Sequence, residues 1–295
     1  MRLVSTILSL VFSSLTALAG SGGTLMTPVR EGFALSPQEQ AMTAWNGTYA
    51  VVGENNGVPV TIASAVLVFK KTLGKDTYVG FLTARHVIDD NNAFIQSKQE
   101  TGLGFSENVS LNFQTNAVSM TSLKGERIAS PVSSSHDLGL YILKISDPVS
   151  TPVVSFSPTC TLTQGQKLSF IGYPMTYTRP VNAQNVEIQN PLLVTKRGSE
   201  GVFVGDQMRP KGFPGIVYGT TVDALQGNSE GAVVDKKGFL IGIVSGAKTL
   251  ENSRFSGLEG KYNLISHSGI VDCGSAKRFA ETAWQNFLLS LPQEI

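Results

Sequence analysis

Three side chains, far apart in the sequence, could together carry out nucleophilic catalysis. His86 follows a short apolar run, and histidine is the usual general base near neutral pH. Asp137 precedes a second apolar run, where a buried carboxylate can orient an imidazole ring. Ser229 lies on a glycine-flanked turn before a third such run, where backbone amides can face a developing oxyanion. These residue types predict a histidine base, an orienting aspartate and a serine nucleophile.

Each of these residues also has an ordinary structural explanation when it is considered alone. A single histidine is commonly a hydrogen-bonded structural residue, and an aspartate before a strand commonly forms a turn. The stretch Gly227–Gly231 could be no more than a hairpin. The combination of all three favours the catalytic interpretation.

The motifs around these residues resemble those of the trypsin-like peptidases of chymotrypsin fold, including the bacterial HtrA-type branch. The motifs that carry the resemblance are Thr83–His86, Asp137–Tyr141 and Gly227–Gly231, and the resemblance extends from about Ala44 to Asp272. Asn228 places the chain with the Gly-Asn-Ser members. Many animal members of the family have Asp at this position, and it forms an ion pair with the amino terminus that activation cleavage creates. An asparagine amide cannot form that ion pair, so the resemblance implies an enzyme that is not activated in this way.

The resemblance implies a role for each residue of the triad. His86 takes the proton of Ser229, Asp137 fixes the histidine tautomer, and Ser229 attacks the scissile carbonyl. The backbone amides of Gly227 and Ser229 form the oxyanion hole. His136 is given no role, because consecutive residues of a strand face opposite ways.

One residue departs from the family pattern. The family has two glycines after the nucleophile, and this chain has Glu230 followed by Gly231. If the backbone requires a glycine-only conformation there, Glu230 distorts the oxyanion turn; otherwise its carboxylate points into solvent or contacts a nearby loop. The alternative to an active peptidase is therefore a catalytically impaired binding protein on the same scaffold.

Substrate specificity is predicted from two further stretches. Asp223 lies six residues before Ser229, the spacing at which trypsins carry the aspartate at the base of the S1 pocket. A carboxylate there favours Arg or Lys at the P1 position of the substrate. The opposite pocket wall is expected from Ser245, Gly246 and Ala247. The alternative is that Asp223 only serves its own turn.

The two cysteines, Cys160 and Cys273, lie in regions comparable to those that trypsins join by a disulfide. The resemblance thus implies a bridge that fixes the C-terminal helix to the second barrel. Two buried free thiols are the alternative.

The many short apolar runs of the rest of the chain predict β-barrels or a sandwich, followed by a C-terminal α-helix. The resemblance implies an all-β fold of two six-stranded antiparallel barrels of the chymotrypsin type. A Pro- and Ser-rich connection, Ser146–Pro158, separates two similar halves, and apolar residues at helical spacing over 275–291 predict a helix closed by Pro292. The predicted strands include Tyr49–Val52, Ala63–Lys70, Tyr78–Thr83, Val109–Phe113, Leu138–Ile145, Lys167–Gly172, Gly201–Val204, Ala232–Val234 and Phe239–Val244. The predicted organisation is a signal peptide at 1–19, a mobile segment or pro-region at 20–40, barrels at 41–147 and 148–274, and a helix and tail at 275–295.

The N-terminus and the composition indicate where the protein works. Arg2 precedes the apolar stretch Leu3–Leu18, which predicts a secretory signal cleaved after Ala19 and a secreted or periplasmic protein. A net charge of +1 over 295 residues gives no strong attraction to nucleic acid or to an anionic membrane. The predicted function is therefore an exported serine endopeptidase that acts on proteins or peptides. No metal or organic cofactor is expected, and the default expectation is a monomer.

Overall fold

The computed structural model describes residues 37–55, 58–89, 104–112, 117–122, 125–145, 153–173, 196–208, 214–221, 230–249 and 265–292. Residues 1–33 form one unit and lie outside the described ranges, and residues 34–295 form the other. The predicted signal peptide and almost all of the predicted segment 20–40 therefore fall outside the described residues.

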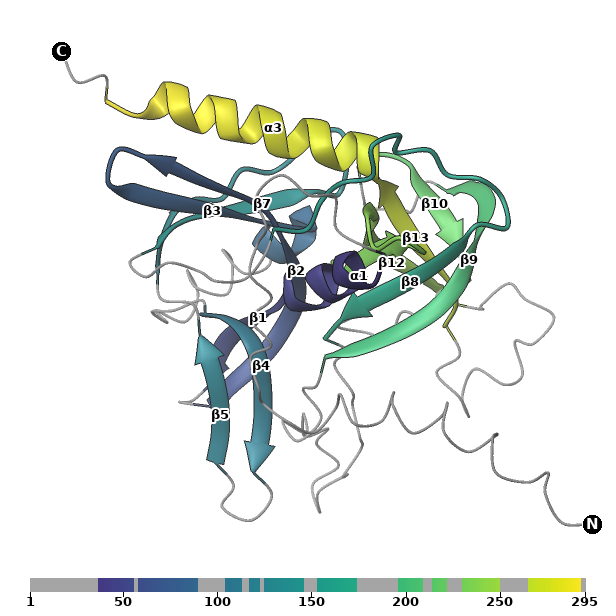
Figure 1. Ribbon diagram of the computed structural model, residues 1–295, viewed down its shortest axis with the longest axis horizontal. Helices are drawn as coiled ribbons and strands as arrows, with labels where there is room; N and C mark the ends of the chain where they lie inside the picture. The colour runs from purple at the N-terminus through teal and green to yellow at the C-terminus, as the bar shows by residue number, and fades with distance from the viewer. Residues whose placement is uncertain are drawn as a thin grey trace, which may run out of the picture. The chain divides into compact units, whose positions relative to one another are not determined.

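The first half of the second unit is an antiparallel sheet of seven strands (Figure 1). Its strand order is β5-β4-β1-β2-β3-β7-β6. The strands are β1 (Thr48–Asn55), β2 (Val58–Leu73), β3 (Asp76–Thr83), β4 (Gly104–Asn112), β5 (Ala117–Ser122), β6 (Gly125–Ala129) and β7 (Gly139–Ile145).

The second half is a closed barrel of six strands in the order β10-β13-β12-β11-β8-β9. Pairing of β9 with β10 closes it. The strands are β8 (Lys167–Gly172), β9 (Arg197–Met208), β10 (Val217–Thr220), β11 (Ala232–Asp235), β12 (Leu240–Thr249) and β13 (Ile265–Asp272).

The prediction of two six-stranded barrels thus holds for the second half only. The first half has seven strands rather than six, and its outer strands β5 and β6 do not pair with each other within the described residues. The additional strand β6 has four exposed residues out of five, so it carries no buried apolar pattern that a sequence could reveal.

Large apolar side chains fill three buried clusters. One lies within the first sheet, where the rings of Tyr49 and Phe81 meet edge to face at 4.9 Å. A second fills the barrel around Phe170 and Phe203. The third contains residues of both halves, such as Leu140 and Ile243, together with helix α3 (Cys273–Ser290). The two halves therefore share one continuous part of the core.

Helix α3 begins two residues earlier than predicted and ends, as predicted, before Pro292. Its N-cap is Asp272, whose carboxylate accepts a hydrogen bond from the Ser275 amide at 3.0 Å. A second helix, α1 (Pro37–Asn46), was not predicted, because its mostly polar sequence has little apolar periodicity. Of the described helices, none is both long and apolar enough to span a membrane.

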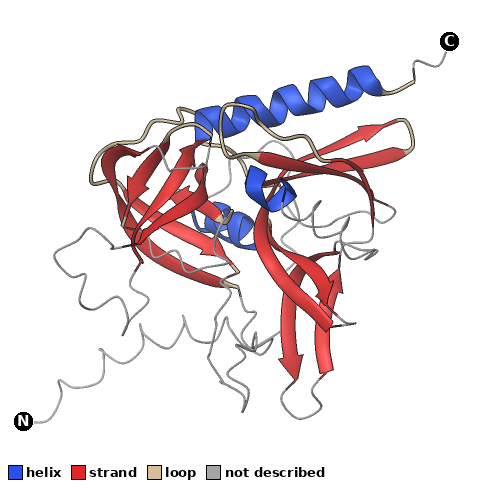
Figure 2. Ribbon diagram, turned by 180° about the vertical axis from the view of Figure 1, so that it is seen from behind, coloured by secondary structure: helices blue, strands red, loops and turns tan. Residues whose placement is uncertain are grey.

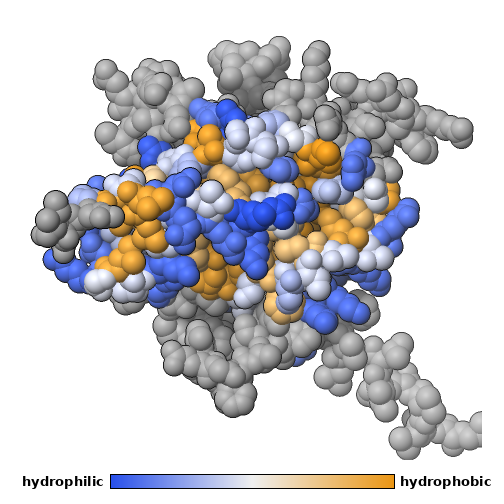
Figure 3. Space-filling view, turned by 90° about the horizontal axis from the view of Figure 1, so that it is seen from above, coloured by the Kyte–Doolittle hydropathy of each residue, from blue (hydrophilic) through white to orange (hydrophobic). Residues whose placement is uncertain are grey.

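Helix α3 joins the barrel to the sheet (Figure 2). At its start, Cys273 forms a disulfide with Cys160, with their Cα atoms 5.2 Å apart. Further along, the Trp284 ring packs against Phe69 of β2 at 5.1 Å and Tyr78 of β3 at 6.0 Å. The outer side of the helix is exposed, on a face where hydrophilic residues run between hydrophobic ones (Figure 3).

Candidate active site

Strand pairing brings His86 and Asp137 together. Strands β3 and β7 are antiparallel neighbours, and Thr83 at the end of β3 lies opposite Gly139 at the start of β7. His86 follows Thr83 by three residues, in a short helical turn at 85–89, and Asp137 precedes Gly139 by two. Two residues 51 positions apart in sequence thus lie at the same end of the sheet.

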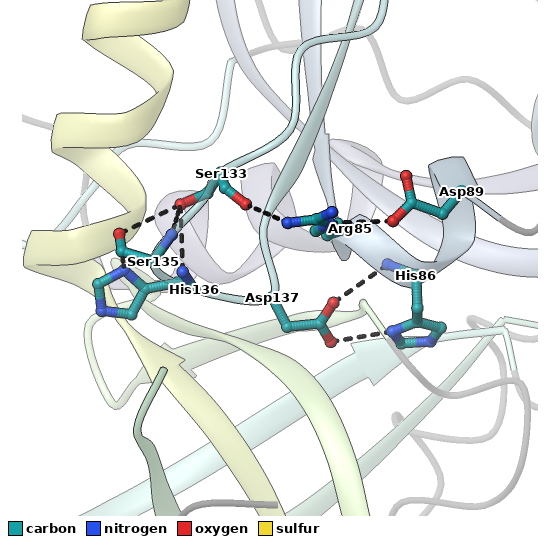
Figure 4. Close-up of polar contacts among 7 residues, drawn as sticks. All are labelled: Arg85, His86, Asp89, Ser133, Ser135, His136 and Asp137. Carbon is teal, nitrogen blue, oxygen red and sulfur yellow. Dashed lines mark hydrogen bonds and ion pairs between the residues drawn. The ribbon is translucent and has the colours of Figure 1, made fainter. Parts of the chain in front are cut away.

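The aspartate holds the histidine by two hydrogen bonds (Figure 4). His86 Nδ1 lies 2.9 Å from Asp137 Oδ2, and the His86 backbone amide donates to Asp137 Oδ1 at 3.1 Å. Asp137 is 1% exposed, whereas the histidine side chain is 30% exposed. A buried carboxylate thus orients an imidazole that is itself partly exposed.

The helical turn that carries His86 is also held by contacts that do not involve Asp137. The Arg85 guanidinium pairs with Asp89 at 2.9 Å and donates to the Ser133 carbonyl at 3.2 Å. Gly139 allows the turn to approach β7, because a Cβ there would lie 2.5 Å from Ile88 Cδ1 and 3.0 Å from a backbone carbonyl. The position of the imidazole is therefore fixed by the sheet and by the turn.

Ser245 of β12 supports Asp137 from the second half of the chain. Its hydroxyl donates to Asp137 Oδ2 at 2.8 Å, and the side chain is fully buried. The register of β12 against β13 shifts between Val244 and Gly246, and such a bulge re-aims the residue within it. Ser245, which was predicted in the wall of the substrate pocket, thus has its hydroxyl bonded to the aspartate.

Glu230 lies on the opposite side of the imidazole. Its Oε1 is 3.1 Å from His86 Nε2, and the residue is 0% exposed. The expectation that this carboxylate points into solvent or contacts a nearby loop is therefore wrong. The backbone of Glu230 has a φ of 75°, in the region that favours glycine. The distortion of the oxyanion turn that was expected with such a backbone concerns Gly227 and Ser229, which lie outside the described residues.

The segment that begins with Glu230 is tied to β12. The Glu230 amide donates to the Val244 carbonyl at 2.8 Å, and the Val244 amide donates to the Gly231 carbonyl at 3.2 Å. Gly231 has no room for a side chain, since a Cβ there would lie 2.4 Å from the Ile171 carbonyl oxygen. Val244 and Ser245, adjacent in β12, thus place one carboxylate on each side of His86.

These contacts shift the ionisation of the histidine. Burial by itself lowers the pKa of His86, but the hydrogen bonds and negative charges of Asp137 and Glu230 outweigh it and raise that pKa to about 10. Burial raises the pKa of Asp137, and this is outweighed by the hydrogen bond and charge of His86 and by the Ser245 hydroxyl, so that the net shift is downward. In this arrangement His86 is an imidazolium at neutral pH.

His136 is turned away from this site, although it precedes Asp137. Its ring lies beside α3 and its Nδ1 is 2.9 Å from the Ser135 hydroxyl (Figure 4). A groove of about 370 Å³ opens there between residues 131–136 and the helix. Neither His86 nor Glu230 lines it, so this groove is separate from the candidate site.

Several predicted site residues cannot be placed. Ser229, Gly227 and Asp223 lie outside the described residues, and of Gly246 and Ala247 only the strand position in β12 is described. Within the described ranges, no group of three or more His, Cys, Asp or Glu side chains could hold a metal ion. Ser245 and Glu230 were both named from the sequence, but their contacts were not predicted. The contact of Ser245 with Asp137 has no local signal, and the signal for Glu230 was a side chain where the family has glycine.

Comparisons with known proteins place this geometry in context. A family model described as a trypsin-like peptidase domain matches residues 63–243. Among solved structures, the HtrA-type protease AlgW with decapeptide is 14% identical, with a TM-score of 0.52; the alignment covers 85% of this chain and 68% of that one. This likeness shows a mostly β, chymotrypsin-like fold with a closed barrel and a C-terminal helix.

A second solved structure is an inactive form of a serine-to-alanine mutant of Rv3671c from M. tuberculosis H37Rv. It is 12% identical over 86% of this chain and 92% of that one, with a TM-score of 0.47. Comparison with curated protein sequences finds no match.

Proposed function

Because the chain belongs to the trypsin-like peptidase domain family, we propose that it is an exported serine endopeptidase with His86, Asp137 and Ser229 as its catalytic triad. The observation that carries the proposal is the contact between His86 Nδ1 and the buried Asp137 carboxylate, 2.9 Å long and supported by Ser245. An acceptor on Nδ1 keeps the proton on that nitrogen. The lone pair of a neutral imidazole then lies on Nε2, where a general base needs it.

The proposed reaction follows from this tautomer. Nε2 of His86 takes the proton from the Ser229 hydroxyl as its oxygen attacks the scissile carbonyl, and the amides of Gly227 and Ser229 stabilise the oxyanion. The imidazolium then returns the proton to the leaving amine, which leaves an acyl-enzyme. Water, activated by the same nitrogen, releases the acid and regenerates the serine.

A fluorophosphonate probe tests the nucleophile directly. We expect covalent labelling of the purified protein that disappears in the variant Ser229→Ala, since the probe reacts with an activated serine hydroxyl. Because Glu230 contacts Nε2, labelling is measured from neutral to alkaline pH. Labelling that persists in Ser229→Ala, or no labelling at any pH of either the unmodified chain or Glu230→Gly, would exclude the proposed nucleophile.

For specificity, we propose that Asp223 lies at the base of the S1 pocket and favours Arg or Lys at P1. Opposite charges in a partly desolvated pocket attract strongly, so Asp223→Ala should lower kcat/KM for basic P1 substrates by roughly 10²-fold or more and change it little for apolar ones. A library of fluorogenic peptides varied at P1 measures both. An equal loss for all P1 residues would show that Asp223 serves only the turn.

One observation favours a second candidate function, a binding protein that has lost catalysis. The carboxylate of Glu230 lies on the nitrogen that the reaction needs. In that case the scaffold binds peptide without cleaving it. The variant Glu230→Gly separates the two functions. It would gain hydrolysis if Glu230 only blocks the base, and would stay inactive if other parts of the site have also lost their catalytic geometry.

A further inference from the structure

Both nitrogens of the His86 ring face carboxylates. Nδ1 lies 2.9 Å from Asp137 and Nε2 lies 3.1 Å from Glu230. The Asp137 carboxylate accepts a hydrogen bond from Nδ1, and the Glu230 carboxylate is the ion-pair partner of Nε2. Two carboxylates, one at each ring nitrogen, favour the doubly protonated imidazolium. In that state Nε2 has no lone pair with which to accept a proton from a hydroxyl nucleophile.

The backbone holds Glu230 in this position. A φ of 75° lies in the left-handed region, which favours glycine and is strained for glutamate. The amide nevertheless stays bonded to the Val244 carbonyl at 2.8 Å, and the side chain is fully buried. Strain of this kind is retained at functional sites where the surrounding contacts compensate for it, and the ion pair with His86 is such a contact.

We propose that Glu230 is a latch on the candidate base: its carboxylate occupies Nε2 of His86 and keeps the site inactive until it is displaced. This proposal rests on the serine peptidase function and adds its regulation. Glu230 acts through His86 and is a positioning residue, since its described contact is with the base. Displacement leaves the contact between His86 and Asp137 in place, so the site becomes competent without further rearrangement of those two residues.

The charges around the ring determine the pH at which the latch opens. Asp137 from the segment before β7 and Glu230 from the segment before β11 both contact the imidazole, and the Ser245 hydroxyl of β12 bonds Asp137. The positive charge of Arg85 is engaged by Asp89. Together the two carboxylates raise the pKa of His86 to about 10, against the effect of burial.

The direction of the pH effect follows from that raised pKa. Between the ordinary histidine pKa of 6.5 and about 10, the imidazolium is retained only because of its partners, and the stability that the pairing contributes is lost as the pH rises through about 10. Acidification does not produce a free base, because His86 stays charged. The latch should therefore open on the alkaline side.

The test compares the unmodified chain with Glu230→Gln and Glu230→Gly. Glutamine keeps the shape and removes the charge, whereas glycine removes the side chain and suits the backbone conformation, so at least one variant is expected to fold. Glu200→Gln, on an exposed position of β9, is the matched control. The His86 ring is titrated by NMR through its nitrogen-15 shifts, and fluorophosphonate labelling rates are measured over the same pH range.

We expect the His86 pKa in the unmodified chain to lie far above 6.5 and to fall in both variants, with the control unchanged. At about pH 7.5 the glycine variant should be labelled roughly 10-fold to 100-fold faster, because its base is free to act. An ordinary His86 pKa in the unmodified chain, or labelling no faster in either variant than in the control, would overturn the latch.

The two proposals fail in different ways. If no variant is labelled while the His86 pKa is high and falls on removal of Glu230, the ion pair is real and the peptidase function is wrong. If labelling depends on Ser229 but neither the rate nor the His86 pKa responds to Glu230, the peptidase function holds and the latch is wrong.

Discussion

Asp137→Asn is expected to lower kcat by about four orders of magnitude while the protein stays folded. Asp137 Oδ2 accepts from both His86 Nδ1 and the Ser245 hydroxyl, and Oδ1 accepts from the His86 amide. An asparagine must place its NH₂ group at one of these positions, opposite a donor. At the Oδ2 position it would force the ring to accept at Nδ1 and to carry its proton on Nε2, which removes the base.

The measurement is hydrolysis of a fluorogenic peptide, with circular dichroism to verify folding. The comparison is clearest when Asp137→Asn and the protein it is compared with both also carry Glu230→Gly. The contact of Glu230 with His86 is then absent from both. Asp76→Asn is the matched control, since this carboxylate also forms an ion pair, with Lys144, and lies at the start of β3, the end of that strand away from His86. If Asp137→Asn were to lower kcat no more than this control does, the aspartate would have no part in catalysis.

The second large effect concerns stability. Trp284→Ala is expected to lower the free energy of unfolding by about 3–5 kcal/mol, the usual cost of removing a large buried aromatic side chain. The indole is 7% exposed and lies between the rings of Phe69 and Tyr78 from the sheet and Phe287 from its own helix. Its removal would leave a cavity where α3 covers the sheet.

Urea denaturation followed by circular dichroism would measure the change. Leu289→Ala is the control on the same helix, because Leu289 is 78% exposed and its loss should change the free energy of unfolding by no more than about 0.5 kcal/mol. If both variants unfolded at the same urea concentration, the packing of α3 against the sheet would contribute nothing to stability.

The sequence predicted the strands whose apolar residues are buried. Lys167–Gly172 was predicted with the same bounds as β8, and Leu138–Ile145 differs from β7 by one residue. Strands β5, β6, β10 and β13 are not among the examples named from the sequence. Strand β10 has only four residues, β6 is mostly exposed, and β13 mixes serine, histidine and glycine with its apolar residues. Pairing with neighbouring strands therefore determines that these segments are strands more than their own residue pattern does.

At the site, sequence reasoning worked where a residue stands in a compact motif. His86 and Asp137 were selected in this way, and the structure places their side chains in contact. The contact of Ser245 with Asp137 depends on a bulge in β12, and that of Glu230 with His86 depends on a positive φ. Neither the register of a strand nor the sign of a backbone angle at a non-glycine residue can be derived from residue spacing.

The position of α3 also constrains how the sequence can vary. The helix is joined covalently to the barrel through Cys160 and Cys273 and packs by aromatic contact on β2 and β3. Interiors are close-packed, so a gain in volume at Phe69 or Tyr78 must be met by a loss on the helix. Residues of the sheet and of the C-terminal helix are therefore expected to covary in evolution. The two halves should be inherited together rather than exchanged separately between proteins.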